Sequence, residues 1–178
     1  MKNVAIGVLV AIAGASTASA DVTVTFTNQT WTGFQFTQLY NAGDLSGTLT
    51  GVSVDAVLLA SVADTWADDI TIYVDDLPLS TGGALQVGGF SNLGAAERHF
   101  WANGGSPNPG TPVNGFIALT NPLNMAAWPV FLGNGYGATG TSGTWSGSIT
   151  LHGVEVVPAP GALALLGLGG LVATRRRR

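Results

Sequence analysis

In Val22-Thr23-Val24-Thr25-Phe26-Thr27, apolar side chains alternate strictly with threonines. Successive side chains of a β-strand point to opposite faces of a sheet, so this two-residue period predicts a strand with one buried and one solvated face. The same period recurs in Ile70-Thr71-Ile72-Tyr73-Val74-Asp75. These two segments are the firmest strand predictions, and they indicate the fold class.

The sequence between the two ends repeats this pattern in weaker form. The apolar parity changes near Gly51 and near Gly153, as a β-bulge would cause. Shorter strands are predicted for residues 33–40, 84–87, 115–119 and 130–132. One or two helical turns are expected within residues 93–101. No longer helical period is present between the ends, so we predict an all-β fold, an antiparallel β-sandwich of jelly-roll type.

The N-terminal residues have the pattern of a secretory signal peptide. Lys2 precedes an apolar core over residues 4–15, and Ala18-Ser19-Ala20 is the small-residue pattern that signal peptidase accepts. We therefore expect a signal-peptide helix over residues 1–20 that is removed after Ala20. An uncleaved anchor is the alternative.

The C-terminal residues predict a short hydrophobic helix. Residues 160–174 are apolar or small, and Arg175-Arg176-Arg177-Arg178 follow as a cytoplasmic stop. A helix of this length covers about 22 Å, less than the hydrocarbon core of about 30 Å. A marginal span suits a segment that inserts transiently and is then processed. A permanent tail anchor is the alternative.

The order of these C-terminal parts carries a family resemblance. Val157-Pro158-Ala159-Pro160, the apolar helix and the closing arginines resemble the PEP-CTERM sorting signal of bacterial surface proteins, in its Val-Pro-Ala-Pro variant. Ala159 stands where that family usually has Glu. The resemblance implies that an exosortase recognises the tail during export, and that the protein is secreted to the cell surface or extracellular matrix. The expected organisation is a signal peptide (1–20), a secreted domain (21–156) and a sorting tail (157–178).

A second resemblance concerns the secreted domain. Residues 45–74, in particular 66–74, and residues 143–151 after a glycine-rich turn are similar in pattern to the P-domain-like jelly roll attached to secreted proteases. This resemblance implies a sandwich and says nothing about a ligand.

The charge of the chain is divided unevenly. The formal net charge is −4, but among Lys and Arg only Arg98 lies outside the two ends, whereas all ten carboxylates lie between Asp21 and Glu155. The secreted domain therefore carries one positive and ten negative charges, or −9. Such a surface repels nucleic acids and anionic lipids. The chain has no cysteine, so the core must stabilise the domain without disulfides.

Asp64, Asp68 and Asp69 are the candidate ligands for calcium. They cluster before the second firm strand, and calcium prefers hard oxygen ligands. Asp75 and Asp76 follow that strand, roughly 17 Å away, so the two groups cannot share an ion. The spacing also differs from an EF-hand loop. Solvated turn carboxylates are the favoured interpretation, and calcium, the one cofactor considered, is the alternative.

Trp101 and Trp128 are the candidates for stacking on sugar rings. Both lie beside predicted loops, whereas Trp145 falls on the apolar side of its strand and is expected in the core. Burial of Trp101 and Trp128 is nevertheless the favoured interpretation, because large aromatic residues supply most of a small core.

No catalytic signature is present in the sequence. The chain has no nucleophile elbow, zinc-helix motif or phosphate loop, and its two histidines are His99 and His152. A Ser/His/Asp set assembled in space stays open. The triplet Glu97-Arg98-His99 is expected to form a solvated ionic cluster on a helical turn.

These observations predict a secreted protein that is not an enzyme. Its expected role is structural or adhesive and linked to exopolysaccharide. The alternatives are a carbohydrate-binding module that uses loop tryptophans, with or without calcium, and a secreted hydrolase. The expected partners are signal peptidase, an exosortase-type enzyme and polysaccharide.

Overall fold

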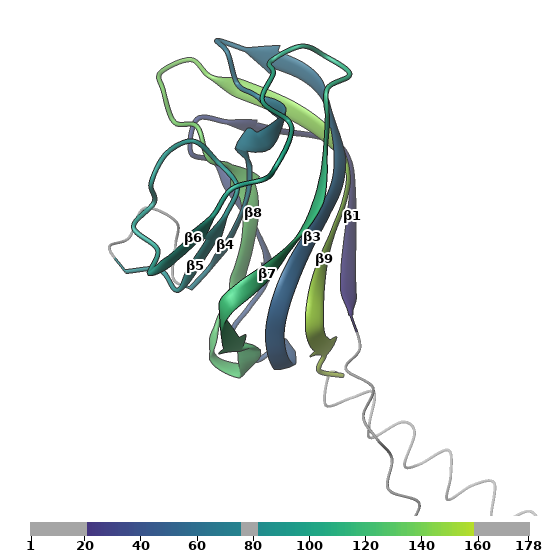
Figure 1. Cartoon of the computed structure of the whole chain (residues 1–178), viewed down its shortest axis with the longest axis vertical. Helices are drawn as coiled ribbons and strands as arrows, with labels where there is room; N and C mark the ends of the chain where they lie inside the picture. The colour runs from purple at the N-terminus through teal and green to yellow at the C-terminus, as the bar shows by residue number, and fades with distance from the viewer. Residues whose placement is uncertain (1–20, 76–81, 159–178) are drawn as a thin grey trace, which may run out of the picture.

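A computed structural model describes residues 21–75 and 82–158, which form two β-sheets packed face to face (Figure 1). The strands are β1 (Val22–Thr32), β2 (Phe36–Tyr40), β3 (Leu45–Val62), β4 (Ile70–Val74), β5 (Leu85–Val87), β6 (Glu97–His99), β7 (Pro112–Asn124), β8 (Val130–Asn134) and β9 (Ser142–Val156). Two short 3-10 helices complete the elements, η1 (Ala67–Asp69) and η2 (Met125–Ala127). The predicted all-β sandwich is confirmed. The predicted flanking helices lie outside the described residues.

The two sheets differ in size and in strand direction. The four-stranded sheet has the order β1-β9-β3-β7, and the five-stranded sheet has the order β2-β8-β4-β5-β6. All neighbouring strands are antiparallel except β5 and β6, which run parallel. The antiparallel prediction therefore fails at this one edge of the described sheets.

The firm strand predictions and the parity changes are confirmed. The residues of β4 are all buried, and β1 alternates between its two faces over residues 22–27. The register of β3 against β9 shifts between Gly47 and Gly51, which accounts for the parity change near Gly51. On β9, Leu151 and Val154 are both buried although they lie three residues apart. A bulge therefore keeps apolar side chains on the inner face where strict alternation would expose them.

The helical turns expected within residues 93–101 are wrong. Residues 97–99 form β6, which pairs with β5. The carboxylate of Glu97 accepts hydrogen bonds from the backbone N–H groups of Thr120 (2.7 Å) and Asn121 (3.0 Å) on β7. These contacts join the edges of the two sheets, and they stabilise an extended conformation that local sequence does not reveal.

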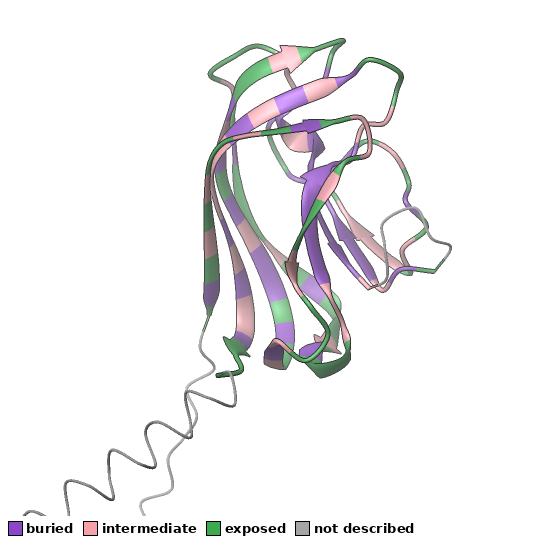
Figure 2. Cartoon of the chain, turned by 180° about the vertical axis from the view of Figure 1, so that it is seen from behind, coloured by how far each residue is buried: buried purple, intermediate pink, exposed green. Residues whose placement is uncertain are grey.

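Buried residues lie on the strands of both sheets (Figure 2), and the core that they form consists mainly of aromatic and branched side chains. Trp31 and Trp145 contact each other in the core, with ring centroids 5.8 Å apart. Their indole N–H groups donate to Thr37 Oγ1 and to the Ala67 carbonyl, so neither buried donor lacks a partner. Full burial of each large apolar side chain contributes roughly 1.5–3 kcal/mol. The prediction that Trp145 belongs to the core is confirmed.

The two ends of the sandwich differ in what they carry. Asp21, before β1, and Val157, after β9, lie at the same end, which we call the terminal pole (Figure 1). From there β3 runs to the opposite end, the distal pole, because Leu45 pairs with Val156 whereas Val62 pairs with Ser142. The connections that carry the candidate site lie at the distal pole.

Candidate functional site

A pocket of about 350 Å³ lies at the distal pole, lined by residues from four connections between strands. Its aromatic lining residues are Trp66, Phe90, Phe100, Trp101 and Tyr136. Its acidic lining residues are Asp64, Asp68 and Asp69. The structure thus brings the three calcium candidates together with one of the two tryptophan candidates.

Asp69 joins two segments of the pocket wall through hydrogen bonds to its buried carboxylate. Its side chain is only 4% exposed; one carboxylate oxygen accepts a hydrogen bond from the Trp66 N–H (2.7 Å), and the other accepts one from the Phe90 N–H (3.1 Å). Burial raises the pKa of Asp69 to about 6, against the lowering effect of these two bonds and with a further rise from the charge of Asp68. With both oxygens occupied, Asp69 fixes η1 to the loop after β5 and is not a free ligand.

Asp64 and Asp68 present free acceptors to the pocket. Asp64 is exposed, and its positive φ of 58° is a conformation that Asp and Asn tolerate. Asp68 is half-buried, and desolvation raises the pKa of its carboxyl group. Within residues 21–75 and 82–158, neither carboxylate accepts a hydrogen bond from another residue. The Asp68 carboxylate interacts with its own backbone N–H, and the other oxygens of the two groups remain open to a ligand.

The exposed rim of the pocket is built by a tight turn after β5. Gly88 and Gly89 have positive φ values of 85° and 79°, and a Cβ on Gly88 would lie 2.2 Å from the Ile70 carbonyl oxygen. Glycine is therefore required where the chain turns against β4. The turn lifts Phe90 to the rim, where it is 76% exposed and packs edge-on against Tyr136, with ring centroids 5.9 Å apart.

Arg98 supports this rim without lining the pocket. Its Nη2 donates hydrogen bonds to the carbonyl oxygens of Gly89 (3.0 Å) and Phe90 (2.6 Å). Its guanidinium group also stacks on Phe100, 4.4 Å from the ring centroid. Arg98 thus positions two of the aromatic walls, a role that its sequence context did not suggest.

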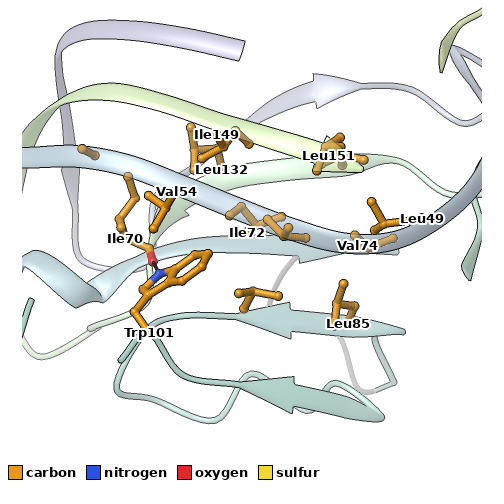
Figure 3. Close-up of a cluster of buried hydrophobic side chains, with 14 of the residues drawn as sticks. Leu49, Val54, Ile70, Ile72, Val74, Leu85, Trp101, Leu132, Ile149 and Leu151 are labelled. Carbon is orange, nitrogen blue, oxygen red and sulfur yellow. Dashed lines mark hydrogen bonds between the residues drawn. The ribbon is translucent and has the colours of Figure 1, made fainter. Parts of the chain in front are cut away.

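Trp101 forms the floor of the pocket and not an open platform. It is only 6% exposed, and its indole N–H donates to the Ile70 carbonyl oxygen at 2.9 Å (Figure 3). Sugar stacking needs an open ring face, which Trp66 offers because it is 45% exposed. Trp128 follows η2 near the terminal pole and packs half-buried against the core. The two predicted platform residues therefore lie at opposite ends of the domain.

The predicted calcium ligands share a pocket but not a common coordination point. Among the residues that the structure describes, no group of three acidic, histidine or cysteine side chains is placed to hold a metal ion.

A second polar cluster lies on the outer face of the four-stranded sheet. The Oγ of Ser53 lies 2.7 Å from His152 Nε2, and His152 Nδ1 lies 2.8 Å from a carboxylate oxygen of Asp21. The hydrogen bond from the Gly153 N–H to Asp21, followed by the interaction with His152, lowers the pKa of Asp21. Phe116 packs edge-on against the imidazole, with centroids 5.2 Å apart. The structure therefore does assemble a Ser/His/Asp chain, although Ser53 lies in the middle of a strand and not at a turn.

Glu97 and His99 do not form the solvated cluster that was expected with Arg98. They interact with each other at 2.6 Å on one side of β6, while Arg98 reaches the pocket rim. The alternation of an extended strand separates the three side chains.

The sorting motif is only partly within the described residues. Val157 and Pro158 are exposed, and the Val157 N–H donates to the Asp44 carbonyl oxygen at 2.9 Å. Ala159 and Pro160 lie outside the described residues, as do the cleavage residues Ala18 and Ala20 and the arginines 175–178. In the part of the chain that the structure describes, no helix is long and apolar enough to cross a membrane.

Comparison with known proteins gives no match for this chain. No protein-family model, no curated protein and no solved structure matches it.

Proposed function

We propose that the chain is an exported, adhesive surface protein whose β-sandwich binds polysaccharide in the pocket at the distal pole. The observation that carries this proposal is the combination of open aromatic rings with unpaired carboxylates in one pocket. Ring faces pack against the C–H faces of sugars, and carboxylate oxygens accept hydrogen bonds from sugar hydroxyls. A concave site with a few polar groups among aromatic walls is typical of a small-ligand or glycan site.

The proposed route to the surface is the signal peptide followed by PEP-CTERM-like sorting. Signal peptidase would act after Ala20, and an exosortase-type enzyme would act on the tail that follows Val156. The position of Asp21 and Val157 at one pole supports this proposal, because the pocket lies at the other end. A domain held at its terminal pole would present the pocket away from the membrane.

We further infer that the sandwich is a jelly roll. The sheet orders β1-β9-β3-β7 and β2-β8-β4-β5 support this topology, because strands consecutive along the chain alternate between the sheets from β1 to β4 and from β7 to β9. This is the arrangement of two Greek keys. In this scheme β6, which follows β5 along the chain, is an additional strand at the edge of the five-stranded sheet.

The binding proposal is tested with variants of two rim rings. Trp66→Ala and Phe90→Ala should each weaken binding of a neutral β-linked glucose hexasaccharide by about fivefold, since one ring contact is worth roughly 1 kcal/mol. Binding is measured by isothermal titration calorimetry on the full chain in mild non-ionic detergent. Phe116→Ala is the matched control, because its exposure of 60% lies between those of Trp66 (45%) and Phe90 (76%) and it lies outside the pocket. Equal loss in all three variants, or in none, contradicts the proposal.

A hydrolase is the second candidate, favoured by the hydrogen-bonded chain of Ser53, His152 and Asp21. In this scheme His152 accepts the Ser53 hydroxyl proton as Oγ attacks an ester carbonyl, and Asp21 stabilises the imidazolium. The test is labelling by a fluorophosphonate, with Ser53→Ala as the variant and Ser148→Ala, on the same outer face, as its control. Labelling of wild type and Ser148→Ala but not of Ser53→Ala supports the hydrolase, whereas no labelling of wild type excludes it.

A further inference from the structure

We propose that the pocket selects glycans with free, protonated amino groups, that is, polymers of non-acetylated amino sugars. This inference rests on the proposed glycan-binding function and names the ligand class of the same site. Three features of the pocket carry it: the sign of its charge, the state of its free carboxylates and the exposure of its rings.

The charge of the pocket lining is uniformly negative. Three carboxylates line it, and no Lys, Arg or His is among its lining residues. Arg98, the nearest cation in the described chain, donates to the carbonyl groups of Gly89 and Phe90 behind the rim. A ligand with carboxylate or sulfate groups would therefore meet repulsion, and a cationic ligand would meet attraction.

Asp64 and Asp68 have no positively charged partner among the described residues, and an ammonium group of a ligand could be that partner. Asp68 is half-buried, and within the described residues no cation compensates its desolvation, which raises its pKa. A carboxylate in this situation is stabilised by a charge-assisted hydrogen bond. A primary ammonium has three N–H donors, so it can donate to the Asp68 carboxylate and still contact water. A polymer carries one such group on every sugar, so a second ammonium can approach Asp64.

The exposed rings favour the same ligand. Trp66 and Phe90 offer open faces beside these carboxylates. An aromatic face attracts a cation as well as the C–H face of a sugar, so one amino sugar can use both interactions. Acetylation of the amine removes its charge and two of its donors, and should therefore weaken binding while the sugar ring remains the same.

The test compares hexasaccharides of equal length and linkage on the full chain in mild detergent. The ligands are β-1,4-linked hexamers of glucosamine, N-acetylglucosamine and glucose, measured by calorimetry at about pH 6.5, between the usual pKa of a carboxyl group and that of an amine. We expect the glucosamine hexamer to bind about tenfold more tightly than the other two, and we expect added salt to reduce this preference.

Two variants of the pocket carboxylates and one control variant outside the pocket locate the preference. Asp64→Asn combined with Asp68→Asn should remove the tenfold difference, whereas Asp55→Asn, on the outer face of β3, should retain it. Asp64→Asn alone should reduce the difference, and it avoids the half-buried position in case the double variant does not fold. A chelator should leave binding unchanged; loss of binding on chelation assigns the carboxylates to a metal ion and overturns the inference.

The outcomes separate this inference from the proposed function. Equal binding of all three hexamers, sensitive to Trp66→Ala, overturns the amine preference and leaves glycan binding intact. No binding of any hexamer overturns both. Tight binding of the glucosamine hexamer that is unchanged in both carboxylate variants shows non-specific attraction to the acidic surface and overturns the inference.

Discussion

The replacement Asp69→Asn should change how the stability of the fold depends on pH. Asp69 has a pKa of about 6 in the folded chain, against an ordinary value of 3.8. The folded state therefore holds this proton more tightly than the unfolded state, and ionisation costs the folded state free energy. The stabilising effect of the protonated group is fully present below pH 3.8, decreases as the pH rises and is lost above about 6. A shift of about two units, at roughly 1.4 kcal/mol per unit, gives about 3 kcal/mol.

The assay is urea unfolding of the full chain in mild detergent, at a series of pH values that spans this window. The unfolding free energy of wild type minus that of Asp69→Asn should fall by about 3 kcal/mol across the window, because Asn does not ionise. Loss of one hydrogen-bond acceptor in Asn shifts the whole curve by roughly 1–3 kcal/mol without changing its shape. Asp44→Asn is a control for which the difference in unfolding free energy should change with pH in the opposite direction. Hydrogen bonds from Asn41 lower the pKa of Asp44, so the stabilising effect of the ionised group is lost as the pH falls. A difference curve for Asp69→Asn that stays flat or rises with pH refutes the burial argument.

Three further predictions concern stability and are measured by urea unfolding at neutral pH. Gly88→Ala should destabilise the fold by more than about 3 kcal/mol, because its Cβ would meet the Ile70 carbonyl oxygen at 2.2 Å. Gly110→Ala is the control: Gly110 has a similar φ but open space around it, so this variant should lose only about 1 kcal/mol. Equal losses in the two variants contradict the steric explanation. Trp101→Phe should cost about 1–3 kcal/mol, since it leaves the buried Ile70 carbonyl without its indole donor, and an unchanged unfolding midpoint counts against that bond. Glu97→Ala should lower the unfolding free energy by about 1–3 kcal/mol and increase hydrogen exchange at the two β7 amides that donate hydrogen bonds to the Glu97 carboxylate. Exchange at these amides as slow as in wild type would show that this link between the sheets is not needed.

The sequence predicts the strands wherever a local two-residue period is enforced by burial of one face. Alternation in Val22–Phe26 identifies β1, and the parity change at Gly51 identifies a bulge that the register of β3 confirms. β6 could not be found in this way, because Glu97 is held by contacts to residues more than twenty positions away.

The candidate site was predictable in part. The acidic cluster was visible because Asp64, Asp68 and Asp69 are close in sequence. The aromatic wall was not, since Phe90 and Tyr136 come from connections far apart in the chain and meet only when the sheets pack. Trp101 lies beside a loop, yet its indole is buried and donates to the Ile70 carbonyl oxygen on β4, in agreement with the favoured expectation of burial. A position beside a loop therefore does not determine whether a ring is exposed.

The placement of β9 between β1 and β3 determines how the domain would respond to mechanical tension. Val156 ends β9 at one pole, and the pocket lies at the other. If the domain acts as proposed, a pull between a tethered tail and a captured polymer would therefore act along this strand. Loading in that direction shears many ladder hydrogen bonds together on both flanks of β9, whereas a pull across the sheet would peel them apart one after another. The same connectivity that closes the sandwich would thus let it stay folded under drag from flowing water.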